Sequence, residues 1–339
     1  MSNPVLVEVL RGPLVESRHR GAIAVVDADG GAVLTLGDVE TPVIPRSAVK
    51  ALQALALVES GAADRFSLTP QELAVACASH SGEPGHVATV QSMLARAGLN
   101  ASALRCGVHP PLHRPSAEVL FRSGLKPSAV HNNCSGKHAG FLCLACALGA
   151  NPHGYIEPAH AVQREVKSTI EAMSSFPLTE DRQSTDGCSV PTWAVPLKNL
   201  ALAFARFGTG HGAAPVRAQA ALRLRAASAA HPWHIAGSGR FCTEVMTLFA
   251  ERVFVKTGAE GVFCAALPAQ GLGVALKCDD GATRAAEVAT ATMISRFAVL
   301  RDPERDAFQR FVRPTIRNWN GIAVGAMRPS EDLLAAMER

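Results

Sequence analysis

Residues 22–36 read Ala-Ile-Ala-Val-Val-Asp-Ala-Asp-Gly-Gly-Ala-Val-Leu-Thr-Leu, and this stretch indicates how the fold begins. Two apolar runs, 22–26 and 32–36, flank a polar segment that ends in two glycines. Because glycine readily adopts the positive φ that tight hairpin turns require, the stretch predicts two antiparallel strands joined by a short turn.

A second hairpin is predicted near the other end of the chain, where residues 261–267 and 272–277 flank Pro268-Ala269-Gln270-Gly271. A helix is expected over 285–300 and a final strand over 321–327, whereas the middle of the chain is mostly helical in pattern. We therefore expect an α/β fold in which both chain ends build one sheet and a helical lobe is inserted between them.

The predicted organisation is a single catalytic unit over residues 1–339. Its sheet-containing lobe comprises approximately residues 1–60 and 240–339, and its mainly helical lobe comprises approximately residues 61–239.

Composition excludes several classes of protein. Of the 339 residues, 48% are hydrophobic and only 18% are charged, which is opposite to the composition of disordered chains. Aromatic residues total 5%, with one Tyr, so stacking platforms for single-stranded nucleic acid are not expected. A net charge of +4 over this length does not indicate nucleic-acid binding.

The cysteine count points to reduced thiols. Nine cysteines is an odd number in a long chain, unlike the even sets of small disulfide-stapled secreted domains. The N-terminus lacks a basic stretch followed by an apolar one, and the longest apolar segment, 141–150, is about half the length that a bilayer requires. We expect a cytoplasmic protein without a membrane partner.

Ser47-Ala48-Val49-Lys50 opens a predicted helix and is a candidate for nucleophilic chemistry. A Ser and a Lys three residues apart share one helix face, and a Lys of lowered pKa can act as base for the hydroxyl. Lys256-Thr257-Gly258 follows in the order of the Ser-x-x-Lys and Lys-Thr-Gly motifs of β-lactamases and penicillin-binding proteins, although no Ser-Asp-Asn lies between them. The alternative interpretation is a capping serine and a lysine in a turn.

The segment Asn133-Cys134-Ser135-Gly136-Lys137-His138 and the later Cys188 contain candidate metal ligands. By residue type alone, the two cysteines and His138 could supply three ligands to Zn²⁺. The alternative is a polar loop that leads into an apolar helix, with the cysteines buried as small hydrophobes.

Together these motifs resemble those of the Rhizobium-type, or class 3, L-asparaginases. The motifs occur in this order: Ser47-Ala48-Val49-Lys50, Cys77-Ala78-Ser79-His80-Ser81, Asn133-Cys134-Ser135-Gly136-Lys137-His138, Thr185-Asp186-Gly187-Cys188 and Gly239-Arg240-Phe241-Cys242. The resemblance runs from about Val7 to Arg328. It implies a fold like that of serine β-lactamases and glutaminases, hydrolysis of L-asparagine to L-aspartate and ammonia, and a homodimer.

The resemblance also implies roles for individual residues. Two Ser-Lys pairs would be Ser47 with Lys50 and Ser79 with Lys256. Zinc would be bound by Cys134, Lys137 and Cys188. The resemblance thus implies Lys137 as the third ligand, where residue type alone had suggested His138. The residues expected to line the same pocket are Arg46, His138, Asp186 and Cys242. Lys277 is a rival to Lys256, because the sequence around Lys256 is only loosely patterned.

The implied mechanism is double displacement, in which Ser47 attacks the side-chain amide of asparagine and Lys50 takes the proton. Ser79 and Lys256 would relay protons or position the substrate, and zinc would position the substrate rather than activate water. Three alternatives remain: a β-lactamase- or glutaminase-like serine amidohydrolase with a different substrate, a zinc amidohydrolase that uses metal-bound water, and a catalytically silent amide-binding protein.

Overall fold

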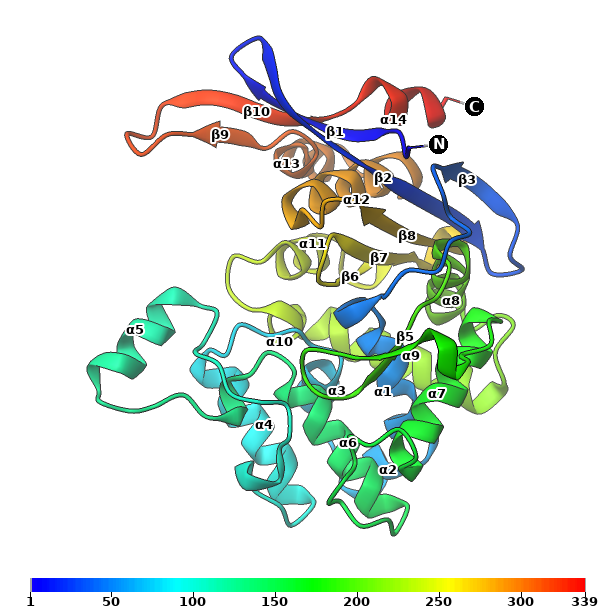
Figure 1. Ribbon diagram of the computed structural model, residues 1–339, viewed down its shortest axis with the longest axis vertical. Coiled ribbons are helices and arrows are strands. Elements are labelled where there is room, and N and C mark those ends of the chain that lie inside the picture. Colours follow the sequence, from blue (N-terminus) through cyan, green and yellow to red (C-terminus); the bar gives the residue numbers. More distant parts are fainter. Residues whose placement is uncertain (1, 339) are drawn as a thin grey trace. The chain divides into compact units, whose positions relative to one another are not determined.

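A computed structural model describes residues 2–338 of the chain (Figure 1). The chain divides into two compact units. The sheet unit comprises residues up to 48, residues 195–212 and the residues from 255 onward, and the helical unit comprises residues 49–194 and 213–254.

The sheet unit is built on one antiparallel sheet with the strand order β6-β7-β8-β2-β1-β10-β9, and β3 pairs with β2. The strands are β1 (Val5–Arg11), β2 (Leu14–Asp27), β3 (Ala32–Leu36), β6 (Phe254–Thr257), β7 (Val262–Leu267), β8 (Leu272–Cys278), β9 (Thr315–Arg317) and β10 (Ala323–Pro329). The long β2 connects the two ends of the sheet because its first half pairs with β1 and its second half with β8.

Both predicted hairpins are confirmed. β2 and β3 pair with Val26 opposite Ala32, and β7 and β8 pair with Leu267 opposite Leu272. β1 from the start of the chain pairs with β10 from its end, so one sheet is built from both chain ends. The predicted α/β fold class is confirmed in this respect, with the helical unit inserted in the sequence between the two groups of strands.

Helices α8 (Leu197–Thr209), α12 (Thr283–Phe297), α13 (Asp302–Val312) and α14 (Glu331–Ala336) complete the sheet unit. Helix α8 packs on β8, β2 and β7, and α12 packs on β7, β8, β10 and β1. The approach of α8 is close, since a Cβ at Gly273 would lie 1.9 Å from the carbonyl oxygen of Ala201. A glycine at this position of β8 therefore permits the contact between helix and sheet.

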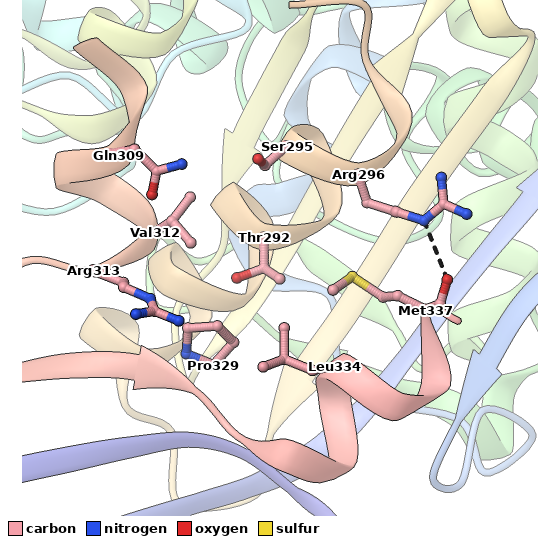
Figure 2. A pocket seen from close by; sticks show the side chains of 9 residues that line it. All are labelled: Thr292, Ser295, Arg296, Gln309, Val312, Arg313, Pro329, Leu334 and Met337. Atoms are coloured by element: carbon pink, nitrogen blue, oxygen red, sulfur yellow. Dashed lines mark hydrogen bonds between the residues drawn. The ribbon is translucent and has the colours of Figure 1, made fainter. Parts of the chain in front are cut away.

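A cavity of about 370 Å³ lies beside α12, α13 and α14 (Figure 2). Its lining combines the side chains of Arg296, Arg313 and Gln309 with those of Val312 and Leu334. None of the predicted site residues lines this cavity.

The helical unit contains α1 (Lys50–Glu59), α2 (Ala62–Arg65), α3 (Pro70–Ala76), α4 (Pro84–Arg96), α5 (Arg114–Arg122), α6 (Ser135–Ala147), α7 (Ala161–Ser174), α9 (Pro215–Ala230), α10 (Pro232–Ala236) and α11 (Phe241–Phe249). A two-stranded ribbon of β4 (Gln183–Thr185) and β5 (Pro191–Trp193) belongs to the same unit. Helix α6 is at the centre: its residues 135–145 are all buried, and it packs against α1, α3, α4 and α7. An apolar helix that is covered on all sides is a core helix. Among residues 2–338 no helix is both long and apolar enough to cross a membrane.

The close packing at Gly273 gives a stability prediction. Gly273→Ala should lower the free energy of unfolding by about 3 kcal/mol, because the added methyl group meets backbone atoms of Ala201 and Ala205 that side-chain rotation cannot move. Urea unfolding followed by circular dichroism measures the change. The matched variant is Gly140→Ala in α6, where the nearest atom is the Leu57 side-chain Cδ2 at 3.3 Å and the gain in helix propensity offsets the tighter contact. Equal losses in the two variants would contradict the assigned role of Gly273.

Candidate active site

The amino group of Lys50 is buried at the start of α1. The residue is 1% exposed, and its Nζ donates hydrogen bonds to Ala78 O at 2.8 Å, Ser79 Oγ at 3.0 Å and Asn133 O at 3.4 Å. The buried amino group thus has three hydrogen-bond partners. The sequence places Ser47 and Lys50 three residues apart, and the structure adds the hydroxyl of Ser79 as a direct partner of Lys50.

Ser79 lies in the loop that follows α3, and backbone hydrogen bonds hold this loop in place. The Ser79 N–H donates to Ile235 O at 2.9 Å, and the next residue, His80, donates its N–H to Asn133 O at 3.2 Å. Asn133 therefore contacts both Lys50 and the loop that carries Ser79. These contacts place a hydroxyl and an amine side by side in a buried environment.

Cys134, Lys137 and Cys188 form a second buried cluster in the helical unit, with exposures of 5%, 2% and 3%. Cys134 directly precedes α6, and Lys137 lies in its first turn with Nζ 2.9 Å from Cys188 Sγ. Cys188 is on the turn between β4 and β5, where the Asp186 N–H donates to Val190 O at 2.8 Å. The Cys188 thiol also lies 3.2 Å from Asp186 Oδ2. All three predicted metal ligands and one predicted pocket residue, Asp186, are thus neighbours.

Charges in this cluster are strongly coupled. A hydrogen bond from Cys188 and the positive charges of Lys50 and Lys137 hold the pKa of the Cys134 thiol well below its ordinary value. Burial disfavours the charged form of Lys137, but its interactions with Cys188, Cys134 and Asp186 outweigh the effect of burial and raise the pKa of Lys137. The cluster therefore favours a thiolate at Cys134 beside a protonated Lys137.

His138 follows Lys137 in α6 and is fully buried. Its Nδ1 lies 2.6 Å from the hydroxyl of Tyr155, and that hydroxyl accepts a hydrogen bond from the Arg105 N–H at 2.9 Å. The Tyr155 proton is then available to His138 Nδ1, which leaves a hydrogen on Nε2. Nε2 has no hydrogen-bond partner among residues 2–338. Burial and the charges of Lys137 and Lys50 hold the pKa of His138 well below its ordinary value, so the ring is neutral.

The donor set of the cysteine cluster suits a thiophilic metal. Within residues 2–338, no group of three or more His, Cys, Asp or Glu side chains is arranged to hold a metal ion. A site here would therefore need the amine of Lys137 as its third donor beside the two sulfurs. Thiolate and nitrogen ligands in a buried pocket are those that Zn²⁺ prefers, and the residues fit this metal once Lys137 has lost its proton.

Three predicted site residues lie in the sheet unit. Arg46 has a φ of +51°, and it opens the 3₁₀ turn Arg46–Val49 that contains Ser47. Lys256 is fully buried on β6, and its Nζ donates to Thr257 O at 2.8 Å. A Cβ at the following Gly258 would lie 2.7 Å from Pro45 O, so the end of β6 lies beside the segment that leads into Ser47.

The rival lysine, Lys277, has a different environment. Its Nζ donates to Glu260 O at 2.7 Å and Cys278 O at 2.6 Å, at the end of β8. Lys277 lies near the end of β8, paired with Ala22 of β2 and Val262 of β7, and is partly exposed, whereas Lys256 is fully buried on β6.

The predicted residues thus fall into two groups. Those of the helical unit are Lys50, Ser79, Cys134, Lys137, His138, Asp186, Cys188 and Cys242, and those of the sheet unit are Arg46, Ser47 and Lys256. Cys242 is the second residue of α11 and is 3% exposed. The sequence analysis did not identify Tyr155, whose hydroxyl contacts and orients His138. The one sequence feature that could have drawn attention to Tyr155 is that it is the only tyrosine of the chain.

Comparison with known proteins supports a family assignment. No curated protein sequence matches the chain. Among solved structures, Mglu in its tris and glutamate form is similar at 16% identity, with a TM-score of 0.46 over 86% of this chain and 62% of that chain. A β-lactamase from Mycobacterium bovis is similar at 17% identity, with a TM-score of 0.40 over 82% of this chain and 95% of that chain. The chain thus spans less than two thirds of the length of Mglu.

A family model described as L-asparaginase II matches residues 7–329, which is nearly the whole chain and includes every predicted site residue. The chain therefore belongs to the L-asparaginase II family.

Proposed function

We propose that this protein is an L-asparaginase, an amidohydrolase that converts L-asparagine to L-aspartate and ammonia. Membership of the L-asparaginase II family supports the reaction class. The observation that carries the proposal is the buried hydrogen bond of 3.0 Å between Lys50 Nζ and Ser79 Oγ, which places the proposed base beside a hydroxyl. The choice of Ser47 as the nucleophile follows the family resemblance. A serine hydroxyl is a weak nucleophile by itself, and an adjacent amine that accepts its proton activates it.

The reaction would proceed through an acyl-enzyme on Ser47. Ser47 Oγ attacks the side-chain carbonyl carbon of asparagine, and its proton passes to the deprotonated amine of Lys50. The C–N bond then breaks, the nitrogen takes a proton and leaves as ammonia, and an aspartyl ester remains on Ser47. Water attacks this ester, the ester C–O bond breaks, Ser47 regains a proton, and L-aspartate leaves.

Ser79 and Lys256 would assist these proton transfers. Ser79 Oγ is in direct contact with Lys50 Nζ and can pass a proton between the amine and the departing nitrogen. Lys256 is fully buried in the sheet unit, and its amino group, when protonated, would stabilise negative charge that develops on the substrate oxygen.

We also propose that Cys134, Lys137 and Cys188 bind Zn²⁺. When bound, zinc would supply a Lewis acid that holds the amino-acid end of the substrate. His138 and Asp186 would contribute polar groups to the same pocket, since His138 has an unpartnered Nε2 within residues 2–338 and Asp186 contacts Cys188. The homodimer and the cytoplasmic location are further proposals that derive from the family resemblance and the composition.

Activity measurements on point variants test the proposed mechanism. Ser47→Ala, Lys50→Met and Ser79→Ala should each lower kcat/KM for L-asparagine by about 10²- to 10⁴-fold, the range for loss of a nucleophile or an acid–base group. The assay is ammonia release from L-asparagine, with L-glutamine and a β-lactam in parallel.

Lys256→Met and Lys277→Met provide the matched comparison between a proposed catalytic lysine and its rival. Lys256→Met should lose activity, and Lys277→Met should retain it to within about twofold, as surface substitutions usually do.

Turnover of glutamine or a β-lactam without turnover of asparagine would overturn the proposed substrate. Asparagine binding without ammonia release would indicate a silent binding protein, and full activity in Ser47→Ala together with loss on chelation would favour metal-bound water as nucleophile.

Metal analysis tests the zinc site. Dialysed wild type should contain about one zinc per chain, and Cys134→Ser and Cys188→Ser should lose it, because each removes one of three donors. Inductively coupled plasma mass spectrometry measures the content, and the thermal midpoint with and without added zinc gives a second readout. Cys146→Ser is the control, since Cys146 is on the same helix, α6, but is partly exposed. Stoichiometric zinc in the double variant of Cys134 and Cys188 would contradict the assignment.

A further inference from the structure

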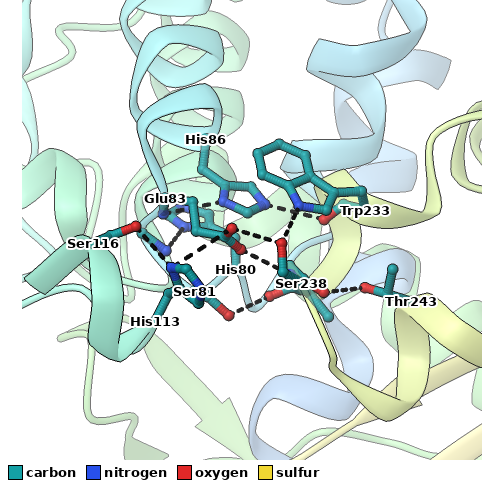
Figure 3. Close-up of polar contacts among 12 residues, drawn as sticks. His80, Ser81, Glu83, His86, His113, Ser116, Trp233, Ser238 and Thr243 are labelled. Carbon is teal, nitrogen blue, oxygen red and sulfur yellow. Dashed lines mark hydrogen bonds and ion pairs between the residues drawn. The ribbon is translucent and has the colours of Figure 1, made fainter.

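A series of hydrogen bonds joins the loop of residues 79–83 to the turn of residues 235–238 (Figure 3). The Ser79 N–H donates to Ile235 O at 2.9 Å, and the Ser81 hydroxyl donates to Ala236 O at 2.7 Å. The series ends at Glu83, which contacts Ser238. The loop that presents Ser79 to Lys50 is thus attached along its length to the turn that precedes α11.

Glu83 is the charged member of this series. Its carboxylate accepts the Ser238 N–H at 2.8 Å and the Ser238 hydroxyl at 2.7 Å, and His113 Nδ1 lies 3.7 Å from it. The side chain is only 9% exposed. A buried carboxylate is costly unless it is hydrogen-bonded, and hydrogen bonds to a charged acceptor are roughly twice as strong as those between neutral groups. Glu83 is therefore the strongest single connection between loop and turn.

The backbone of the turn is adapted to this contact. Gly237 has a φ of +111°, and a Cβ there would lie 2.5 Å from Glu83 Oε1 and 2.7 Å from Ser81 Oγ. Only glycine allows the turn to approach so closely at this φ. The turn and the carboxylate thus fit each other at atomic contact distance.

Other contacts hold the same region independently of the carboxylate. His86 stacks on Trp233 with ring centroids 3.8 Å apart, and its Nε2 lies 3.1 Å from Trp233 O. The Trp233 Nε1–H donates to Ser238 Oγ at 3.0 Å. Loss of the Glu83 carboxylate would therefore leave Trp233 packed on His86 of α4 while removing the bonds to Ser238 at the end of the loop opposite Ser79.

The geometry points to Glu83 as a positioning residue for the proposed Ser-Lys chemistry: through Ser238 it holds the 79–83 loop so that Ser79 Oγ stays within hydrogen-bond distance of Lys50 Nζ. This inference rests on the proposed function. Glu83 acts through the loop, four residues from Ser79, and does not donate or accept a proton in the reaction. A shift of the loop by a fraction of an ångström would lengthen the 3.0 Å bond on which proton transfer depends.

Steady-state kinetics test this role. Glu83→Ala should lower kcat for L-asparagine by about 10- to 100-fold with KM nearly unchanged, because the loop positions a reacting group. Glu83→Gln should recover most of kcat, since the amide oxygen still accepts the Ser238 N–H. Ser238→Ala should lower kcat less, and the effects of Glu83→Ala and Ser238→Ala should be non-additive in the double variant.

Glu72→Ala is the matched control. Glu72 is another buried carboxylate of the helical unit, and it pairs with Arg96 at 2.9 Å and caps α3 at the end away from Ser79. The Glu72→Ala substitution should lower thermal stability with little effect on kcat. A wild-type kcat in Glu83→Ala, or equal losses of kcat in Glu83→Ala and Glu72→Ala, would overturn the positioning role.

Amide hydrogen exchange separates this inference from the proposed function. Glu83→Ala should speed exchange of the Ser79 N–H, which is bonded to Ile235 O, whereas Glu72→Ala should not. If the wild type releases no ammonia from asparagine, the proposed function fails, and exchange still reports whether Glu83 holds the loop. Unchanged exchange at Ser79 in Glu83→Ala would contradict the inference whatever the activity.

Discussion

The structure of the helical unit depends on one buried amino group. Lys50 places its amino group where water cannot reach it, and burial of a lysine is tolerated only when each N–H finds an acceptor. The acceptors come from segments far apart in sequence: two from the start of the loop that follows α3 and one from the residue before Cys134. The same amine therefore fixes the loop of Ser79 and the entrance to α6, where the cysteine cluster begins. The proposed Ser-Lys pair and the proposed zinc site are therefore both positioned by the hydrogen bonds of Lys50.

The parts of the fold that could be predicted from the sequence are those encoded locally. Gly30 and Gly31 permit the β2–β3 turn, and Pro268 to Gly271 form the β7–β8 turn, so both hairpins follow from neighbouring residues. The pairing of β1 with β10 joins residues more than 300 positions apart. It was inferred only from the arrangement of strands at both ends of the chain. The packing of α8 on β8 could not be predicted, because its requirement for glycine at 273 is visible only once the helix lies on the sheet.

In the candidate site, too, the local sequence patterns could be predicted and the long-range contacts could not. The i to i+3 spacing of Ser47 and Lys50 is a local pattern, whereas the bond from Lys50 to Ser79 spans 29 positions and depends on how α1 and α3 pack. Spacing alone favoured His138 as a metal ligand, and the family resemblance favoured Lys137. The structure places Lys137 Nζ against Cys188 and turns His138 Nδ1 toward Tyr155. Glu83 could not be assigned from sequence, since its role requires the turn at Gly237 to lie against it.

The proposed chemistry requires the buried amine of Lys50 to serve acyl transfer at a serine. Rapid-quench mass spectrometry of the intact protein during turnover of L-asparagine tests it most directly, with peptide mapping to locate the modified residue. We expect a transient aspartyl ester on Ser47 in the wild type and none in Lys50→Met. Ammonia release at the full rate in Lys50→Met, or turnover in the wild type with no ester on any serine, would contradict it.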